Sequence, residues 1–169
     1  AKNYFIERKE IKANISHEEP SHIFKGHLFD FQKIGLSFLE KNKRCLLADE
    51  MGLGKTVEAL AFLSKQESPI IIVVPAHLIT QWEDEIKRFL PTMKTHIIKG
   101  LNPQKNPIDK EADIYLIHYL LLRGWDEILA EMDFKTIIFD EIQELRRIGS
   151  LKYQSAELIT KDYGKDLYR

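Results

Sequence analysis

The sequence contains almost no cysteine and no long apolar segment. Cys45 is the only cysteine among 169 residues, which excludes an internal disulfide and a cysteine-rich zinc site. Such sparing use of cysteine predicts a reducing, intracellular setting. The longest apolar run, residues 70–76, includes a proline and is much shorter than the roughly 18 residues that a membrane-spanning helix needs. These absences argue against a disulfide-built secreted scaffold and against a membrane partner.

The sequence also lacks an excess of charge of either sign. Lys and Arg number 25 and Asp and Glu number 26, so the formal net charge is −1. This balance excludes a strongly basic protein that coats nucleic acid, but it allows a local basic face. Five cations and no acidic residue lie between Ile86 and Pro107. That cluster is either an ordinary solvated surface or such a basic face.

Apolar residues in the rest of the chain follow two patterns. A β-branched run without alternation is typical of a strand buried on both faces, and apolar residues three or four apart are typical of helices. The patterns predict strands at 44–48, 70–74, 95–99, 113–118 and 136–139, and helices near 30–39, 56–65, 78–89, 121–132 and 151–159. Asp30 is the predicted N-cap of the first helix, and a glycine weakens the fourth.

Strands and helices that alternate in this way predict an α/β fold with a mostly parallel sheet and helices on both faces. Residues 1–26 carry few signals and are predicted to be an N-terminal extension, while residues 27–169 form one domain. Ligands of such folds bind at the carboxyl ends of the strands.

A glycine-rich turn comes directly after the first predicted strand. Gly52 and Gly54 allow a tight turn whose amides can point at a phosphate, and the following helix adds its positive end. Lys55 would reach the β- and γ-phosphates, and the Thr56 hydroxyl would bind Mg²⁺. The turn departs from the usual phosphate-loop pattern at its first position, where Asp49 replaces a glycine. The strand before it and the helix after it still favour a phosphate loop over a chance surface turn.

A pair of acidic residues, Asp140 and Glu141, follows the last predicted strand. An aspartate at such a strand end can hold Mg²⁺, and a neighbouring glutamate can orient the attacking water. An acidic pair alone is weak evidence, because it is often just the start of a helix. The phosphate loop upstream makes the pair informative.

At these residues the sequence resembles the Swi/Snf-type ATPases, a branch of the superfamily-two helicases and translocases. Residues 49–56, Asp-Glu-Met-Gly-Leu-Gly-Lys-Thr, resemble motif I of that family, in which Asp-Glu is the norm. Residues 140–143 resemble motif II, with Ile142 in place of the usual alanine. The resemblance runs from about residue 28 to residue 145. It implies that ATP contacts Gln32, Asp49, Glu50, Met51, Gly52, Leu53, Gly54, Lys55 and Thr56.

Three further stretches resemble family motifs. Residues 28–35 resemble the segment that carries the adenine-reading glutamine, here Gln32, which without the family is an exposed polar residue on a helix. Residues 73–83 resemble motif Ia and residues 117–119 resemble motif Ib, both of which line the groove that tracks nucleic-acid backbone. The resemblance therefore implies DNA contacts by His77, Gln81, His118 and Tyr119. Trp82 shares a helical stripe with apolar residues and is predicted to be core.

The resemblance implies that residues 27–169 are the first RecA-like, phosphate-loop lobe of a translocase that couples ATP hydrolysis to movement on duplex DNA. Its cofactors would be ATP and Mg²⁺, with Lys55, Asp140 and Glu141 as catalytic residues and Thr56 and Asp140 as metal ligands. Its partners would be DNA, the second RecA-like lobe, and a protein bound to that DNA. Motif III and the second lobe are not in this sequence. We therefore expect the chain alone to bind nucleotide weakly and to hydrolyse it hardly at all.

Other functions remain open at this point. A small-molecule kinase also uses a phosphate loop, but the sequence shows no arginine-rich lid. A non-catalytic interaction module would keep the fold, although the intact Lys55, Thr56, Asp140 and Glu141 argue against it. An RNA-directed helicase is disfavoured only by the resemblance of the loop to the duplex-DNA branch.

Overall fold

A computed structural model of the chain describes residues 18–42, 54–145 and 150–160. The predicted strand at 44–48 and residues 49–53 of the phosphate loop lie outside the described residues. The chain divides into two compact units. The first unit contains the described residues among 1–65 and 85–92, and the second contains those among 66–84 and 93–169.

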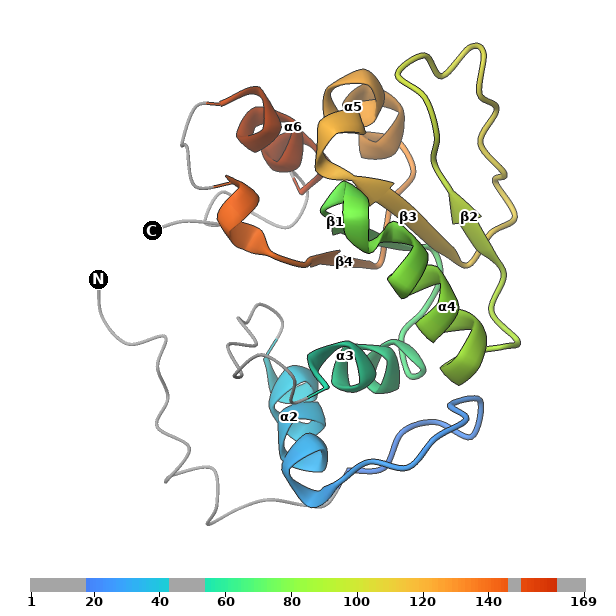
Figure 1. Ribbon diagram of the computed structural model, residues 1–169, viewed down its shortest axis with the longest axis vertical. Coiled ribbons are helices and arrows are strands. Elements are labelled where there is room, and N and C mark those ends of the chain that lie inside the picture. Colours follow the sequence, from blue (N-terminus) through green and yellow to red (C-terminus); the bar gives the residue numbers. More distant parts are fainter. Residues whose placement is uncertain (1–17, 43–53, 146–149, 161–169) are drawn as a thin grey trace. The chain divides into compact units, whose positions relative to one another are not determined.

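The helices and strands of the structure match most of the predicted elements (Figure 1). The first unit contains α2 (Asp30–Lys41) and α3 (Lys55–Leu63). The second unit contains β1 (Ile70–Val74), β2 (Thr95–Ile97), β3 (Ile114–His118), β4 (Thr136–Phe139), α5 (Leu122–Ala130) and α6 (Leu151–Ile159). Helix α4 (Ile79–Phe89) has residues in both units. Short 3-10 turns lie at Ala76–Leu78, Tyr119–Leu121 and Ile142–Leu145.

The four described strands form one parallel sheet in the order β2-β3-β1-β4. Strand β1 is central and pairs with its neighbours in a fixed register, with Val74 opposite His118 and Val73 opposite Phe139. The carboxyl ends of β1, β3 and β4 therefore meet at the same edge. This arrangement confirms the predicted α/β fold with a parallel sheet.

Both faces of the central strands are buried. On one face, Ile71 and Tyr115 belong to a core cluster with Trp125 of α5 and Ile159 of α6, helices that lie side by side in Figure 1. The side chains that point to the other face, including Ile72, are fully buried as well. This double burial explains why residues 70–74 are apolar throughout instead of alternating with polar residues.

Strand β2 is an edge of the described sheet and is much shorter than its partner. It has three residues, all half-buried, where the sequence predicts a strand over 95–99. Lys94 comes directly before it, and Lys99 follows shortly after it with an exposed side chain. The strand pairs only with β3, through the register that sets Thr95 opposite Ile114.

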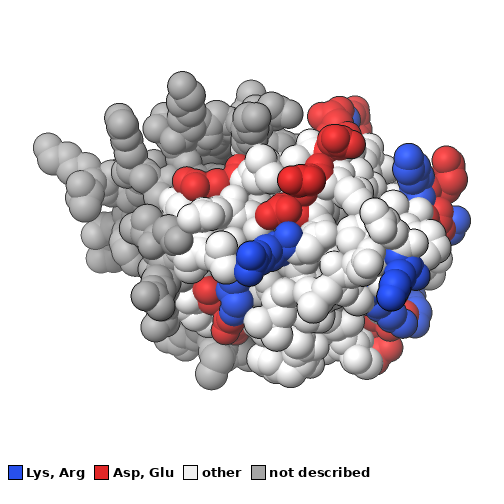
Figure 2. Space-filling model, turned by 90° about the horizontal axis from the view of Figure 1, so that it is seen from above, with Lys and Arg blue, Asp and Glu red and all other residues white. Residues whose placement is uncertain are grey.

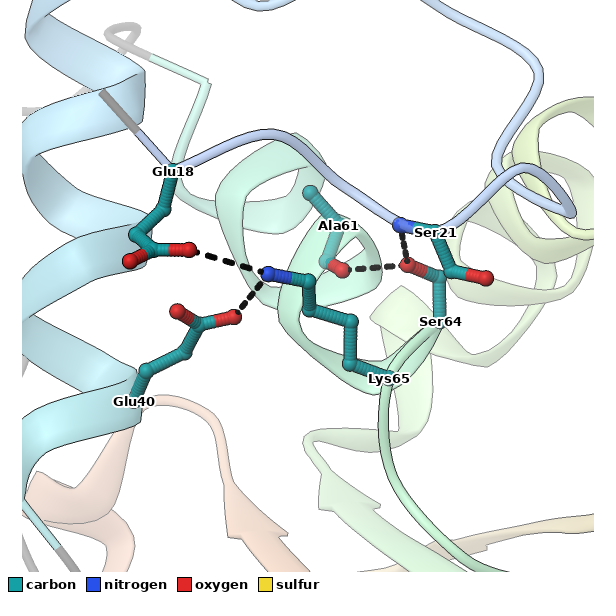
Figure 3. Close-up of polar contacts among 6 residues, drawn as sticks. All are labelled: Glu18, Ser21, Glu40, Ala61, Ser64 and Lys65. Atoms are coloured by element: carbon teal, nitrogen blue, oxygen red, sulfur yellow. Dashed lines mark hydrogen bonds and ion pairs between the residues drawn. The ribbon is translucent and has the colours of Figure 1, made fainter. Parts of the chain in front are cut away.

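In the first unit, polar contacts attach the segment before α2 to the end of α3 (Figure 3). The Lys65 ammonium lies 2.5 Å from a Glu40 carboxylate oxygen and 3.4 Å from a Glu18 oxygen. The Ser64 hydroxyl accepts a hydrogen bond from the Ser21 N–H at 3.0 Å and donates one to the Ala61 carbonyl at 2.6 Å. These bonds satisfy polar groups where α3 ends.

The start of α2 differs from the prediction. Asp30 is the first residue of the helix, and Phe29 occupies the N-cap position that the sequence assigns to Asp30. The Phe29 N–H donates to Gln32 Oε1 at 3.0 Å, as in a capping box. The Gln32 side chain in the first turn thus caps the helix, and no N-cap side chain is needed.

Helix α5 also begins one residue later and ends two residues earlier than predicted. Within the residues that the structure describes, no helix has the length and apolar character needed to cross a bilayer.

Candidate functional site

The described end of the phosphate loop sets up a helix N-terminus. Gly54 is the N-cap of α3 and has φ +79°, a left-handed conformation that favours glycine. A Cβ at this position would lie 2.6 Å from Gln32 Nε2, so the end of the Gln32 side chain would have to shift to admit one. Lys55 and Thr56 are the first two residues of α3, where free N–H groups and the helix dipole favour an anion.

Gln32 lies beside this glycine and is only 4% exposed. Its Oε1 is the acceptor for the Phe29 N–H, and its amide nitrogen faces Gly54. The structure thus brings two predicted nucleotide contacts together within the first unit. Contact of Gln32 with adenine stays a prediction.

In the second unit, the acidic pair follows β4 directly. The Asp140 N–H donates to the Val73 carbonyl at 2.9 Å, which extends the pairing with β1 beyond the strand end. The Glu141 N–H donates to Asp140 Oδ1 at 2.9 Å. Glu141 has φ +53°, a backbone conformation that costs about 1–3 kcal/mol in a residue other than glycine. Strain of this kind is concentrated at functional sites.

Two aromatic side chains also hold Asp140. The sequence alone does not indicate these contacts. Trp82 Nε1 donates to Asp140 Oδ2 at 2.9 Å, and the Tyr119 hydroxyl donates to the Asp140 carbonyl at 2.7 Å. Trp82 is 3% exposed, so the prediction of a core residue is confirmed, although its indole N–H has a specific acceptor. A buried tryptophan needs such an acceptor. That requirement, together with the parallel topology, could have indicated the contact between Trp82 and Asp140.

The predicted nucleic-acid contacts differ in their exposure. His77 and Gln81 are exposed, just beyond the end of β1. His118 is half-buried at the end of β3, and its buried Nδ1 has no hydrogen-bond partner among the described residues. Tyr119 is 2% exposed, with its hydroxyl occupied by Asp140. His77, Gln81 and His118 are therefore at least partly accessible to solvent, whereas Tyr119 is buried.

The charged side chains do not form one uninterrupted basic area on the face drawn in Figure 2, where Lys and Arg lie among Asp, Glu and uncharged residues. Within the cation cluster that the sequence shows, Lys94 Nζ lies 2.8 Å from Asp109 Oδ2. This hydrogen bond raises the pKa of Lys94 and lowers that of Asp109. The Arg88 guanidinium lies 5.0 Å from the centre of the Phe89 ring.

The oxygen groups of Asp140 and Thr56 are of the kind that bind Mg²⁺ when a nucleotide supplies further ligands. In the described ranges, no group of three or more His, Cys, Asp or Glu residues could enclose a metal ion by itself. Mg²⁺ at nucleotide sites is usually held by one or two carboxylates, with phosphates and water as its other ligands. Asp140 of the second unit has such a carboxylate, and Thr56 of the first unit has a hydroxyl. Their contact with Mg²⁺ stays a prediction.

Comparisons with known proteins agree with these features. The sequence model of the SNF2-related domain matches residues 10–163, and the match begins within the segment predicted to be an extension. The chain is 31% identical over 156 residues to the chromatin-remodeling ATPase INO80 of Arabidopsis thaliana, covering 79% of this chain and 10% of that protein. It is 37% identical over 128 residues to the DNA annealing helicase and endonuclease ZRANB3 of Bos taurus, covering 69% of this chain and 12% of that protein.

A solved structure, the SWI2/SNF2 ATPase core domain of Sulfolobus solfataricus, is similar in fold. It has a TM-score of 0.71 and 25% sequence identity, and the match covers 88% of this chain and 32% of that one. The fold is therefore that of a RecA-like ATPase core. The chain belongs to the SNF2-related domain family, and it is a helicase-like ATPase domain. It spans about a tenth of the length of these two curated relatives.

Proposed function

We propose that this chain is the first RecA-like lobe of an ATP-dependent translocase on duplex DNA. The strongest support is that this member of the SNF2-related family has both a phosphate-binding turn and an acidic pair after a parallel strand. A glycine with φ +79° leads into a helix that starts with Lys55 and Thr56. A parallel strand is followed directly by Asp140 and Glu141. Nucleotide-driven motors need both the phosphate-binding turn and the acidic strand end.

Each of these residues has a defined part in the proposal. Lys55 binds the β- and γ-phosphates, and the N–H groups at the start of α3 bind their oxygens. Thr56 and Asp140 hold Mg²⁺, which supplies charge neutralisation on the phosphates when bound. Glu141 orients the attacking water and accepts its proton. Gln32 and residues 49–53 complete the nucleotide contacts.

The loops after the strands provide the DNA contacts in this proposal. His77 and Gln81 follow β1 and are exposed, and His118 ends β3. Such contacts to phosphates are mainly electrostatic, so binding should weaken steeply as salt increases. The second lobe, a protein moved along the DNA and an intracellular location complete the proposal.

The decisive experiment measures ATP turnover, with and without duplex DNA, in the longest protein that contains this chain. Turnover should rise with DNA and fall to background in Lys55→Ala. Glu141→Gln should keep nucleotide binding and lose turnover by about 10²–10⁴-fold, the usual contribution of a positioned general base.

Lys152→Ala is a matched control, because this lysine on α6 pairs with Glu144 and belongs to neither motif. It should retain DNA-stimulated turnover. Turnover that ignores DNA would contradict the translocase and favour a different phosphate-loop enzyme. Function that survives Lys55→Ala would favour a non-catalytic interaction module.

A further inference from the structure

Trp82 reaches Asp140 because of the strand order. Strand β1 leads through a short turn into α4, and β4 pairs with β1 so that Asp140 lies just beyond Val73. A side chain from the first turns of α4 can therefore reach the end of β4. Trp82 occupies that position, and its indole N–H is 2.9 Å from Asp140 Oδ2.

The carboxylate of Asp140 is held at both of its oxygens. Oδ2 accepts from Trp82 and Oδ1 accepts from the Glu141 N–H. Each carboxylate oxygen can accept two hydrogen bonds, so each keeps one direction for another ligand. The two donors fix the plane of the carboxylate.

The backbone of Asp140 is held as well. The Tyr119 hydroxyl donates to its carbonyl at 2.7 Å, and its N–H donates to Val73. The Tyr119 ring stacks on Phe139, with 6.5 Å between ring centres and 24° between the planes. Asp140 therefore cannot rotate freely about its main chain or its side chain.

We propose that Trp82 is a positioning residue, whose indole N–H aims the Asp140 carboxylate at the Mg²⁺ that accompanies the nucleotide, with Tyr119 holding the peptide behind it. This inference rests on the proposed function. It assigns to a residue of α4 a role that its apolar spacing does not indicate. Groups that orient a metal-binding side chain typically change metal affinity by 10–100-fold when they are removed.

Trp82 also fills space in the core, so the test must separate packing from the hydrogen bond. Trp82→Phe keeps an aromatic ring and removes the N–H. Trp125→Phe is a matched control, because Trp125 is 1% exposed and donates to the Gly100 carbonyl at 2.7 Å, outside the acidic pair. Both variants lose one buried indole and one hydrogen bond to an oxygen.

The experiment uses the longest protein that contains this chain and measures binding of a fluorescent ATP analogue at increasing Mg²⁺ concentration. Trp82→Phe should raise the Mg²⁺ concentration at half-saturation by about 10–100-fold and leave affinity without Mg²⁺ unchanged. Trp125→Phe should leave both values within about twofold of the unmodified protein. Electron paramagnetic resonance can measure Mn²⁺ binding in the presence of ADP. It should show weaker Mn²⁺ binding in Trp82→Phe than in Trp125→Phe or the unmodified protein.

Tyr119→Phe, which removes a single oxygen atom, provides a second variant if Trp82→Phe does not fold. It should also raise the Mg²⁺ concentration at half-saturation. In an Asp140→Asn background, Trp82→Phe should have no further effect on Mg²⁺, because the two residues act as one unit.

Equal Mg²⁺ dependence in Trp82→Phe and Trp125→Phe, with Tyr119→Phe unchanged, would overturn the inference and leave the proposed function standing. Absence of nucleotide binding in the unmodified protein, or binding that survives Lys55→Ala unchanged, would overturn the proposed function and this inference together. The two failures are therefore distinguishable.

Discussion

His118 shows what burial does to a single titratable side chain in this protein. It ends β3 opposite Val74, and its Nδ1 is buried with no acceptor or donor among the described residues. Burial lowers its pKa below the ordinary value, because the protein interior disfavours the charged imidazolium. The folded chain therefore prefers the neutral ring.

This preference predicts a loss of stability in mild acid. Below about pH 6.5 the unfolded chain binds a proton on His118 that the folded chain does not bind, so stability falls from that pH down to the lowered pKa of the folded state. Above about pH 6.5 the ring is neutral in both states and contributes no slope. His118→Gln should therefore have a smaller decrease in melting temperature between pH 7.5 and 5.5.

His77→Gln is the control, because His77 is exposed. It should keep the full decrease. Burial also lowers the pKa of His96, so some pH dependence should persist in His118→Gln. An unchanged slope in His118→Gln would contradict this account.

The candidate site residues that the sequence indicates are those that a motif defines by spacing. Lys55, Asp140 and Glu141 belong to motifs, and the structure places each at a helix start or a strand end. The contacts of Trp82 and Tyr119 with Asp140 could not be read in the same way. They join residues 58 and 21 positions apart, and they depend on which strand lies beside which.

At the scale of single elements, α5 shows how a loop can require a glycine inside a helix. The sequence marks Gly124 as a weak point of this helix. In the structure, a Cβ at Gly124 would lie 2.5 Å from the Leu101 carbonyl oxygen. The neighbouring Trp125 indole donates to the Gly100 carbonyl. The loop after β2 thus rests directly on the backbone of α5.

Gly124→Ala should destabilise the chain even though alanine is the better helix former. The helix gains about 1 kcal/mol from the substitution, whereas forcing a methyl group against a backbone carbonyl costs about 1–3 kcal/mol or more. We expect a lower midpoint in urea denaturation. Arg123→Ala, at an exposed neighbouring position, should change stability by less than about 0.5 kcal/mol. A more stable Gly124→Ala variant would show that the loop moves aside easily.

The elements themselves were largely predictable, because their apolar patterns are strong. Residues 70–74 and 114–117 are all apolar or aromatic and are buried, as parallel strands should be. The ends of the elements were harder to predict from the sequence. Capping of α2 by Gln32 instead of Asp30, and the brevity of β2, both depend on local hydrogen bonds that apolar spacing does not encode.

At the scale of the whole molecule, the chain is a small part of its relatives. It spans 32% of the solved SWI2/SNF2 ATPase core and about a tenth of the two curated relatives described above. In the proposed translocase, the second lobe would complete the site with an arginine finger, a group typically worth about 10³–10⁵ in turnover. Within residues 1–169, stretches resemble motifs I, Ia, Ib and II, and none resembles motif III.

The 169-residue chain alone should therefore bind nucleotide weakly and hydrolyse ATP near background, with or without duplex DNA. The measurement compares its turnover with that of the longest protein containing it at equal concentration. Lys55→Ala in the short chain should remove the weak binding. Ready, DNA-stimulated turnover by the short chain would contradict this expectation.

The short strand β2 has a consequence for how copies of this chain behave at high concentration. An exposed strand edge offers unpaired N–H and C=O groups to another chain, and long flat edges promote aggregation. This edge of the described sheet is only three residues long, with lysines on either side of it. Two copies that approached edge to edge could form few hydrogen bonds along so short a strand. The shortness of this edge therefore limits what intermolecular strand pairing could gain there.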